Sequence, residues 1–192
     1  MGLVASGNKV TRELLENGVV QAVCYGLYDV GHQYDEKYAK YVHKCIILWE
    51  IPEKRIVIER EGVKKDYPYT LSKKYTVSLN DKSNLKKDLE TWRGRAFSEQ
   101  ELVGFDVSSI VGVNCLLQVM ITGTDKKYNT ITAILPLHKG MTPVEPENKI
   151  QSFSIKDNDS IPEAAPEWIK TMIEKSREYS DVEQNDEGPF SW

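Results

Sequence analysis

The sequence lacks paired cysteines and histidines, and their absence excludes the common structural metal sites. The chain has three cysteines and three histidines, and no two of them stand at the spacing of a zinc site. Cys24, Cys45 and Cys115 lie among apolar neighbours. We interpret them as reduced thiols in the core, because free cysteine usually behaves as a small hydrophobic residue. No metal and no cofactor are expected.

Long apolar runs and the motifs of common catalytic sites are also missing. No stretch approaches the ~20 apolar residues of a membrane span, and residues 1–11 have no signal-peptide core. A phosphate loop, a dinucleotide-binding glycine motif and a metalloprotease motif are absent, and the carboxylates are scattered. We therefore expect a protein that is not an enzyme, does not enter a membrane and works in the cytoplasm.

Charge is unevenly distributed along the chain. Residues 156–192 hold ten acids and four bases, a net charge of −6, whereas the first 155 residues hold nineteen acids and twenty-one bases, a net charge of +2. A mildly basic body therefore carries an acidic end. This distribution says more about binding partners than the total of −4.

Hydrophobic periodicity predicts a β-rich body with a few helices. A helix is expected from about Ser83 to Gly94, and Ser98 with Glu101 forms a capping box that opens a second, short helix. A C-terminal helix is expected to begin at Pro166. Residues 71–79 alternate between apolar and polar side chains, as in a half-buried strand. The expected strands are 19–30, 41–51 (ended by Pro52), 55–59, 71–79, 115–122 and 128–135.

The order of these elements predicts the fold. Strands come first, then a helix, then two closing strands, whereas a parallel α/β fold would alternate strands and helices throughout. We predict a mainly β protein, an OB-type five-stranded β-barrel with a helix between the third and fourth strands. A different small barrel or an α+β sandwich stays open. The expected parts are an N-terminal extension (1–18), the barrel (19–141), a linker and C-terminal helix (142–179), and a disordered acidic tail (180–192).

Basic and aromatic residues stand together in several segments of the body. Proteins that bind single strands without reading their sequence use cations for the phosphates and flat rings for the bases. We expect such residues to gather on one surface of the barrel. The candidate nucleic-acid contacts are Lys40, Tyr41, Lys44, Trp49, Lys73, Lys74, Lys86, Lys87, Arg93, Arg95, Lys127 and Tyr128.

Some of these residues have a structural interpretation as well. Trp49 lies on a candidate binding strand but can equally fill the barrel. Tyr75 shares the apolar side of its strand, and Lys74 points the other way, which makes Lys74 the better contact. Lys86 and Lys87 near a helix start oppose the helix dipole, and either a phosphate or the nearby aspartates would offset that conflict.

The end of the chain combines acids with aromatics. Acidic side chains repel DNA, so this segment is not expected to be a DNA-binding arm, and exposed rings favour docking on another protein. The tail can compete with DNA for a basic groove or bind a basic pocket on a partner. An unstructured solubilising tail is the alternative. The candidate partner-binding residues are Asp186, Glu187, Pro189, Phe190 and Trp192.

Six segments of the body also carry a family resemblance: 41–50, 72–79, 82–95, 97–102, 104–106 and 136–141. The block around 83–95 is the most specific of them. Together they resemble the OB-fold single-stranded DNA-binding proteins encoded by tailed bacteriophages. The resemblance implies sequence-independent binding of single-stranded DNA in phage replication and recombination, in the host cytoplasm.

The tail is similar in style to those through which such proteins recruit replication proteins, although two aromatics separated by Ser191 replace a single terminal one. A second function stays open. In it the chain is a phage protein-interaction module that inhibits or recruits a host protein, and the tail is the functional part. Self-association of the chain also stays open.

Overall fold

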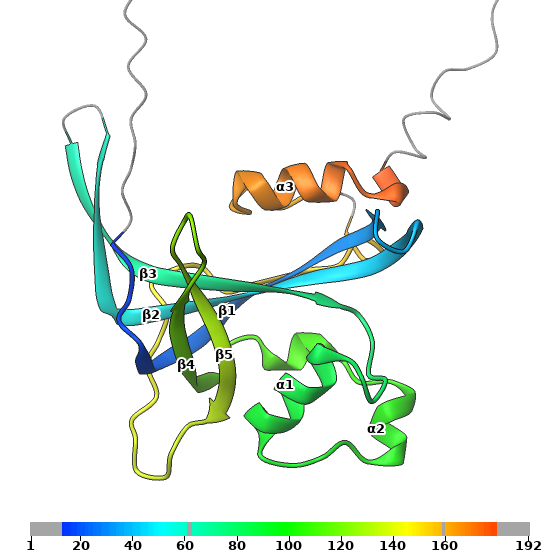
Figure 1. Cartoon of the computed structure of the whole chain (residues 1–192), viewed down its shortest axis with the longest axis horizontal. Coiled ribbons are helices and arrows are strands. Elements are labelled where there is room, and N and C mark those ends of the chain that lie inside the picture. The colour runs from blue at the N-terminus through cyan, green and yellow to red at the C-terminus, as the bar shows by residue number, and fades with distance from the viewer. Residues whose placement is uncertain (1–12, 61–62, 159, 180–192) are drawn as a thin grey trace, which may run out of the picture.

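The structure, a computed structural model, describes residues 13–60, 63–158 and 160–179. Within these residues six strands form one sheet, and helices lie on both of its sides (Figure 1). The mainly β fold predicted from the sequence is confirmed. The elements in chain order are β1 (Gly18–Asp35), β2 (Lys40–Arg60), β3 (Val63–Thr76), α1 (Asn84–Arg93), α2 (Glu99–Val103), the 3₁₀ helix η1 (Val107–Ile110), β4 (Asn114–Thr122), β5 (Tyr128–Pro136), β6 (Gln151–Phe153) and α3 (Glu167–Glu174).

The strand order in the sheet is β3-β2-β1-β4-β5, and each neighbouring pair is antiparallel. The first residues of β1 pair with β4, and most of its length pairs with β2. The short strand β6 pairs in parallel with the middle of β1. The two ends of the sheet are therefore β3 and β5, and α1 lies between β3 and β4 in the chain.

Several strand bounds predicted from the sequence are wrong. The strand expected over 71–79 runs as β3 from Val63 to Thr76. β1 continues beyond Val30, because Gly31 adopts a φ of 67° at a register shift between Asp29 and His32. β2 continues past Pro52, because the register shift before Arg55 leaves Pro52 outside the ladder, where its missing N–H costs no hydrogen bond.

Beyond that shift, β2 and β3 form a two-stranded ribbon that rises away from the rest of the sheet (Figure 1). We call residues 55–60 and 63–68 the β2–β3 arm. The loop after β5 contacts the base of this arm. The buried carboxylate of Glu50 accepts hydrogen bonds from the backbone N–H groups of Glu147 at 2.7 Å and Asn148 at 2.9 Å. Arg55 also bonds Glu147, so the arm and this loop are held together.

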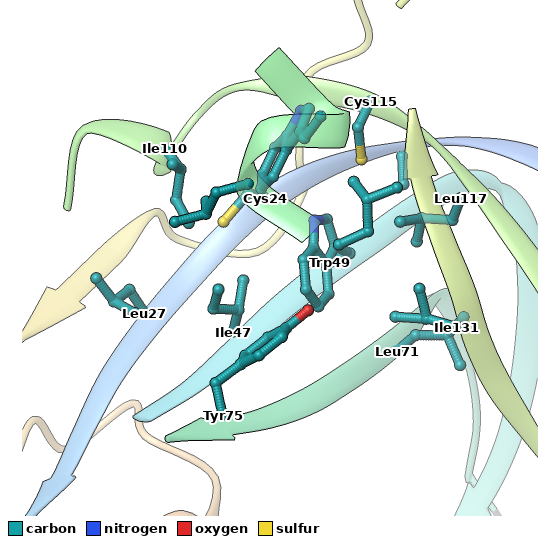
Figure 2. Packing of buried hydrophobic residues seen from close by; sticks show 14 of the residues in the cluster. Cys24, Leu27, Ile47, Trp49, Leu71, Tyr75, Ile110, Cys115, Leu117 and Ile131 are labelled. Atoms are coloured by element: carbon teal, nitrogen blue, oxygen red, sulfur yellow. The ribbon is translucent and has the colours of Figure 1, made fainter. Parts of the chain in front are cut away.

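One side of the sheet packs against α1. Trp49, Leu71 and Tyr75 from the sheet lie in this core, as Figure 2 shows, and Leu89 and Trp92 of α1 cover them. The helix forms where the sequence predicts it. Its start is capped by the Ser83 side chain and its end by a left-handed Gly94. The capping box of Ser98 and Glu101 opens α2, as expected.

The other side of the sheet packs against α3, and β6, which pairs with β1, adds a residue to that core. Ile46 and Leu48 of β2 contact a second core that contains Phe153, Ile169 and Ile173. The stretch 142–165, expected to be a linker, thus contributes a strand and a buried ring.

The residues after α3 are hydrogen-bonded to β1. The backbone N–H of His32 donates a hydrogen bond to the Glu178 carboxylate at 2.9 Å. The imidazole of His32 stacks on the imidazole of His43, with 4.9 Å between the ring centroids. His43 in turn bonds Asp29 at 2.7 Å, and this bond raises the pKa of the imidazole.

Candidate nucleic-acid interface

A groove of about 940 Å³ runs between the β2–β3 arm, the start of β5 and the N-terminal end of α3. In Figure 1 this region lies between the arm, the tip of the β4–β5 hairpin and α3. Residues from six parts of the chain line it, namely the segment before β1, β1, β2, β3, the start of β5 and the start of α3. They meet there because the register shift at Pro52 turns the arm toward the hairpin and α3. Its base is the middle of β3, where Thr70 and Ser72 present polar side chains.

Aromatic rings from three separate elements line the groove and are accessible to solvent. Tyr128 at the start of β5 is 56% exposed, and Trp168 in the first turn of α3 is 48% exposed. Tyr25 of β1 is half-buried beside them. Exposed rings around one groove are the arrangement on which unpaired bases stack.

Hydrogen bonds fix the position of Tyr128 through its neighbour Asn129. The Asn129 amide accepts from the backbone N–H of Leu15 at 2.9 Å and donates to the Leu15 carbonyl at 2.8 Å. Its oxygen also accepts from the Tyr69 hydroxyl at 2.8 Å. Three segments of the groove wall are therefore joined at one side chain.

The groove contains little free positive charge. Among the described residues that line it, Arg55 is the only lysine or arginine. Its guanidinium bonds both Glu147 and Asp66, which raises its pKa and offsets its charge. Cations lie at the margins instead. Lys127 is exposed beside Tyr128, and Lys74 is exposed on the same face of β3 as Thr70 and Ser72.

Of the residues predicted from the sequence, Tyr128 lines the groove. Lys127 precedes Tyr128 in the chain, and Lys74 stands two residues after the lining residue Ser72 on the same face of β3. Three others lie at the opposite end of the sheet, where β1 turns into β2 (Figure 1). There the ring of Tyr41 packs edge-on against Tyr34 with 5.4 Å between centroids, and Arg177 lies over its face. Lys40 starts β2, and Lys44 bonds the Thr76 hydroxyl at 2.8 Å.

Two predicted contacts are corrected by their burial. Trp49 is 0% exposed at the centre of the core, where no base can reach it (Figure 2). Lys73 faces the same side of β3 as Leu71 and Tyr75, and its ammonium lies 2.6 Å from the carboxylate of Asp88 on α1. Side chains two residues apart in a strand share a face, and this alternation in β2 and in β3 explains the two positions.

The predicted residues on and after α1 form a separate group. α1 lies on the opposite side of the sheet from α3 (Figure 1). Lys86 pairs with Asp81 at 2.6 Å, and Lys87 is exposed. Arg93 and Arg95 share the carboxylate of Glu101. The expectation that all the basic clusters gather on one surface is therefore wrong.

Sequence reasoning missed two of the three groove rings. Tyr25 lies in an apolar strand segment and gives no local sign of exposure. Trp168 follows Pro166 in the stripe Trp168, Ile169, Met172 and Ile173, which predicts a buried helix side. Ile169 and Ile173 are buried, but Trp168 sits at the edge of that stripe. The tail residues 180–192 lie outside the described part of the chain.

No protein family model, no curated protein and no solved structure matches this chain. Among the described residues, no group of three or more His, Cys, Asp or Glu side chains is arranged to hold a metal ion. None of the helices in the described part of the chain is long and apolar enough to cross a membrane. Function therefore has to be inferred from the groove and the residues around it.

Proposed function

We propose that this protein binds single-stranded DNA without reading its sequence, and that the groove is where the bases stack. The observation that carries the proposal is the set of solvent-accessible rings, Tyr25, Tyr128 and Trp168, that three elements place around one groove. Lys127 and Lys74 at the margins supply cations for phosphates. Rings without base-specific polar groups favour binding that tolerates any sequence.

We also propose that β1 to β5 form an OB-type barrel. The strand order β3-β2-β1-β4-β5 and a helix between β3 and β4 in the chain are what that fold requires. The two end strands face each other across a seam. Tyr69 of β3 bonds Asn129 of β5 at 2.8 Å, and the Lys73 ammonium donates to the Ile131 carbonyl at 3.4 Å. In OB domains the face of the second and third strands carries single strands, and Thr70 and Ser72 of β3 line the groove here.

The proposed biological setting is the DNA replication and recombination of a bacteriophage, in the host cytoplasm. The acidic end of the chain fits this setting, because like charge keeps it off the phosphates and leaves Phe190 and Trp192 for a protein partner. In the full chain, a Phe190→Ala/Trp192→Ala variant is expected to bind DNA as the wild type does and to lose a replication partner. DNA binding that is lost together with these two rings would contradict this role of the tail.

The test of the groove is a titration of fluorescently labelled oligo-dT with the full chain. Base stacking on one ring is worth about 1–3 kcal/mol, so Tyr128→Ala and Trp168→Ala are each expected to weaken binding about 5- to 150-fold. Tyr38→Ala is the matched control, because Tyr38 is 60% exposed at the other end of the sheet. It is expected to leave the affinity unchanged. Binding to oligo-dT that is no tighter than to duplex DNA would rule the function out.

A second function, a phage protein-interaction module acting on a host protein, is favoured by one observation. Val103 at the end of α2 is 91% exposed, and Leu102 beside it is also exposed, so an apolar corner faces solvent. If the chain shows no affinity for oligo-dT and copurifies with one host protein in a manner that Val103→Glu abolishes, this function replaces the first.

A further inference from the structure

The groove is surrounded by more negative than positive charge. Within the described part of the chain, the charged residues of its lining are Arg55 and Glu13. Asp66 and Glu147 both pair with the Arg55 guanidinium, and their side chains are 53% and 54% exposed. These four groups carry a net charge of −2. Because every phosphate of a nucleic-acid strand is negative, this charge opposes a backbone that lies in the groove.

The uncharged part of the lining suits nucleobases. Tyr25, Tyr128 and Trp168 offer ring faces, and Val57 of the β2–β3 arm adds an apolar side chain that is 64% exposed. A base is flat and uncharged, so it stacks on such rings without the repulsion that a phosphate meets. The groove therefore favours the bases of a strand over its backbone.

Positive charge becomes available only at the margins of the groove. Lys127 is exposed and directly precedes the ring of Tyr128. Lys74 is exposed on β3, two residues beyond the lining residue Ser72 and on the same face of that strand. A strand whose bases enter the groove has its phosphates on the outside, where these two long side chains can contact them.

We propose that the groove takes a single strand with its bases inward and its phosphates toward solvent, and that Lys74 and Lys127 make the phosphate contacts, about two in number. The inference rests on the proposed function and adds the orientation of the strand and the chemistry that holds it. Affinity then depends strongly on the bases and weakly on salt. A binder that covers its strand with cations shows the opposite dependence.

The first experiment measures how the affinity of the full chain for oligo-dT depends on salt. Each phosphate contact on a single strand contributes about −0.7 to the slope of log K against log salt, so two contacts give about −1.4. Affinity should then fall only about sevenfold between about 50 mM and about 200 mM salt. The variant Lys74→Gln/Lys127→Gln should bring the slope close to zero. The matched control, Lys82→Gln/Lys87→Gln, removes two exposed charges beside the start of α1, across the sheet from α3, and should keep the wild-type slope.

The second experiment replaces oligo-dT by an oligomer of the same length that has the sugar–phosphate backbone but no bases. Stacking on one ring strengthens binding about 5- to 150-fold. With three rings in the groove, loss of the bases should weaken binding at least about 100-fold, although the charge of the strand is unchanged.

The outcomes separate this inference from the proposed function. If the wild type does not bind oligo-dT, the proposed function fails and the inference fails with it. If the wild type binds with a slope of about −2.1 or steeper, which corresponds to three or more phosphate contacts, the function stands and the inference is overturned. A wild-type slope in Lys74→Gln/Lys127→Gln, or a loss of less than about 100-fold without bases, overturns it as well.

Discussion

Replacing Lys73 by methionine is expected to destabilise the fold and leave DNA binding intact, although Lys73 stands next to a proposed DNA contact. The Asp88 carboxylate accepts hydrogen bonds from the Lys73 ammonium at 2.6 Å and from the Tyr75 hydroxyl at 2.7 Å. The Lys73 and Asp88 side chains are 27% and 17% exposed. Lys73→Met leaves the carboxylate in the core with one neutral donor, and Asp88→Asn leaves the ammonium without its counter-charge.

The magnitude follows from this partial burial. Removing one partner of a fully buried pair costs roughly 3–5 kcal/mol, and residual water contact reduces the cost of either single change here to about 2–3 kcal/mol. With a urea dependence of about 2 kcal/mol per molar, the unfolding midpoint should fall by about 1 to 1.5 M. The double variant Lys73→Met/Asp88→Asn leaves no unpaired charge, so it should cost less than the sum of the two single changes.

The assay is urea unfolding followed by tryptophan fluorescence, run beside oligo-dT titrations of the same variants. Lys74→Met is the matched control, because Lys74 is the neighbouring residue on the exposed face of β3. It should change stability by less than about 0.5 kcal/mol and weaken DNA binding. A Lys73→Met protein that keeps its stability but binds DNA more weakly would refute this assignment of the two lysines.

Three further outcomes are expected. The bond from Arg95 is the largest of the contacts that lower the pKa of Glu101 from 4.5 to about 2, so its stabilising contribution is complete above pH 4.5 and is lost as the pH falls toward 2. Glu101→Gln should therefore show a shallower loss of stability in that window, and a curve parallel to the wild type would contradict this. Ile173→Ala removes a fully buried side chain between α3 and the sheet and should cost about 2–5 kcal/mol in urea unfolding, whereas a cost below about 1 kcal/mol would mean that α3 is loosely docked. Trp168→Phe should abolish most of the tryptophan quenching on oligo-dT binding, because Trp49 and Trp92 are buried. If the quenching persists in Trp168→Phe and is lost in Trp192→Phe, the signal comes from the tail.

Local signals in the sequence predicted the helices well. Ser83, Gly94, Ser98 and Glu101 each act on backbone groups within a few residues, so their effect is visible in the sequence itself. The ends of the strands depend on partners far along the chain. Nothing near Pro52 says that its position falls in a register shift, which depends on how β3 pairs with β2.

The site was predictable only where position in a strand or turn decides exposure. Tyr128 and Lys127 stand at a hairpin end, and both are exposed. Lys73 could have been placed inside from the alternation that places Leu71 and Tyr75 there. Trp168 could not be placed beside Tyr128 from the sequence, because their contact with one groove depends on the packing of α3 against the sheet.

The docking of α3 and β6 has a practical consequence for dissecting this chain. Ile46 and Leu48 face that helix and strand and lie in a core separate from the one that α1 covers. A fragment cut at the predicted end of the barrel, residue 141, would leave this apolar strip facing water, and its aggregation would mimic a loss of function. A fragment that retains residues up to 179 keeps the strip covered, so the acidic end can be removed and studied without that artefact.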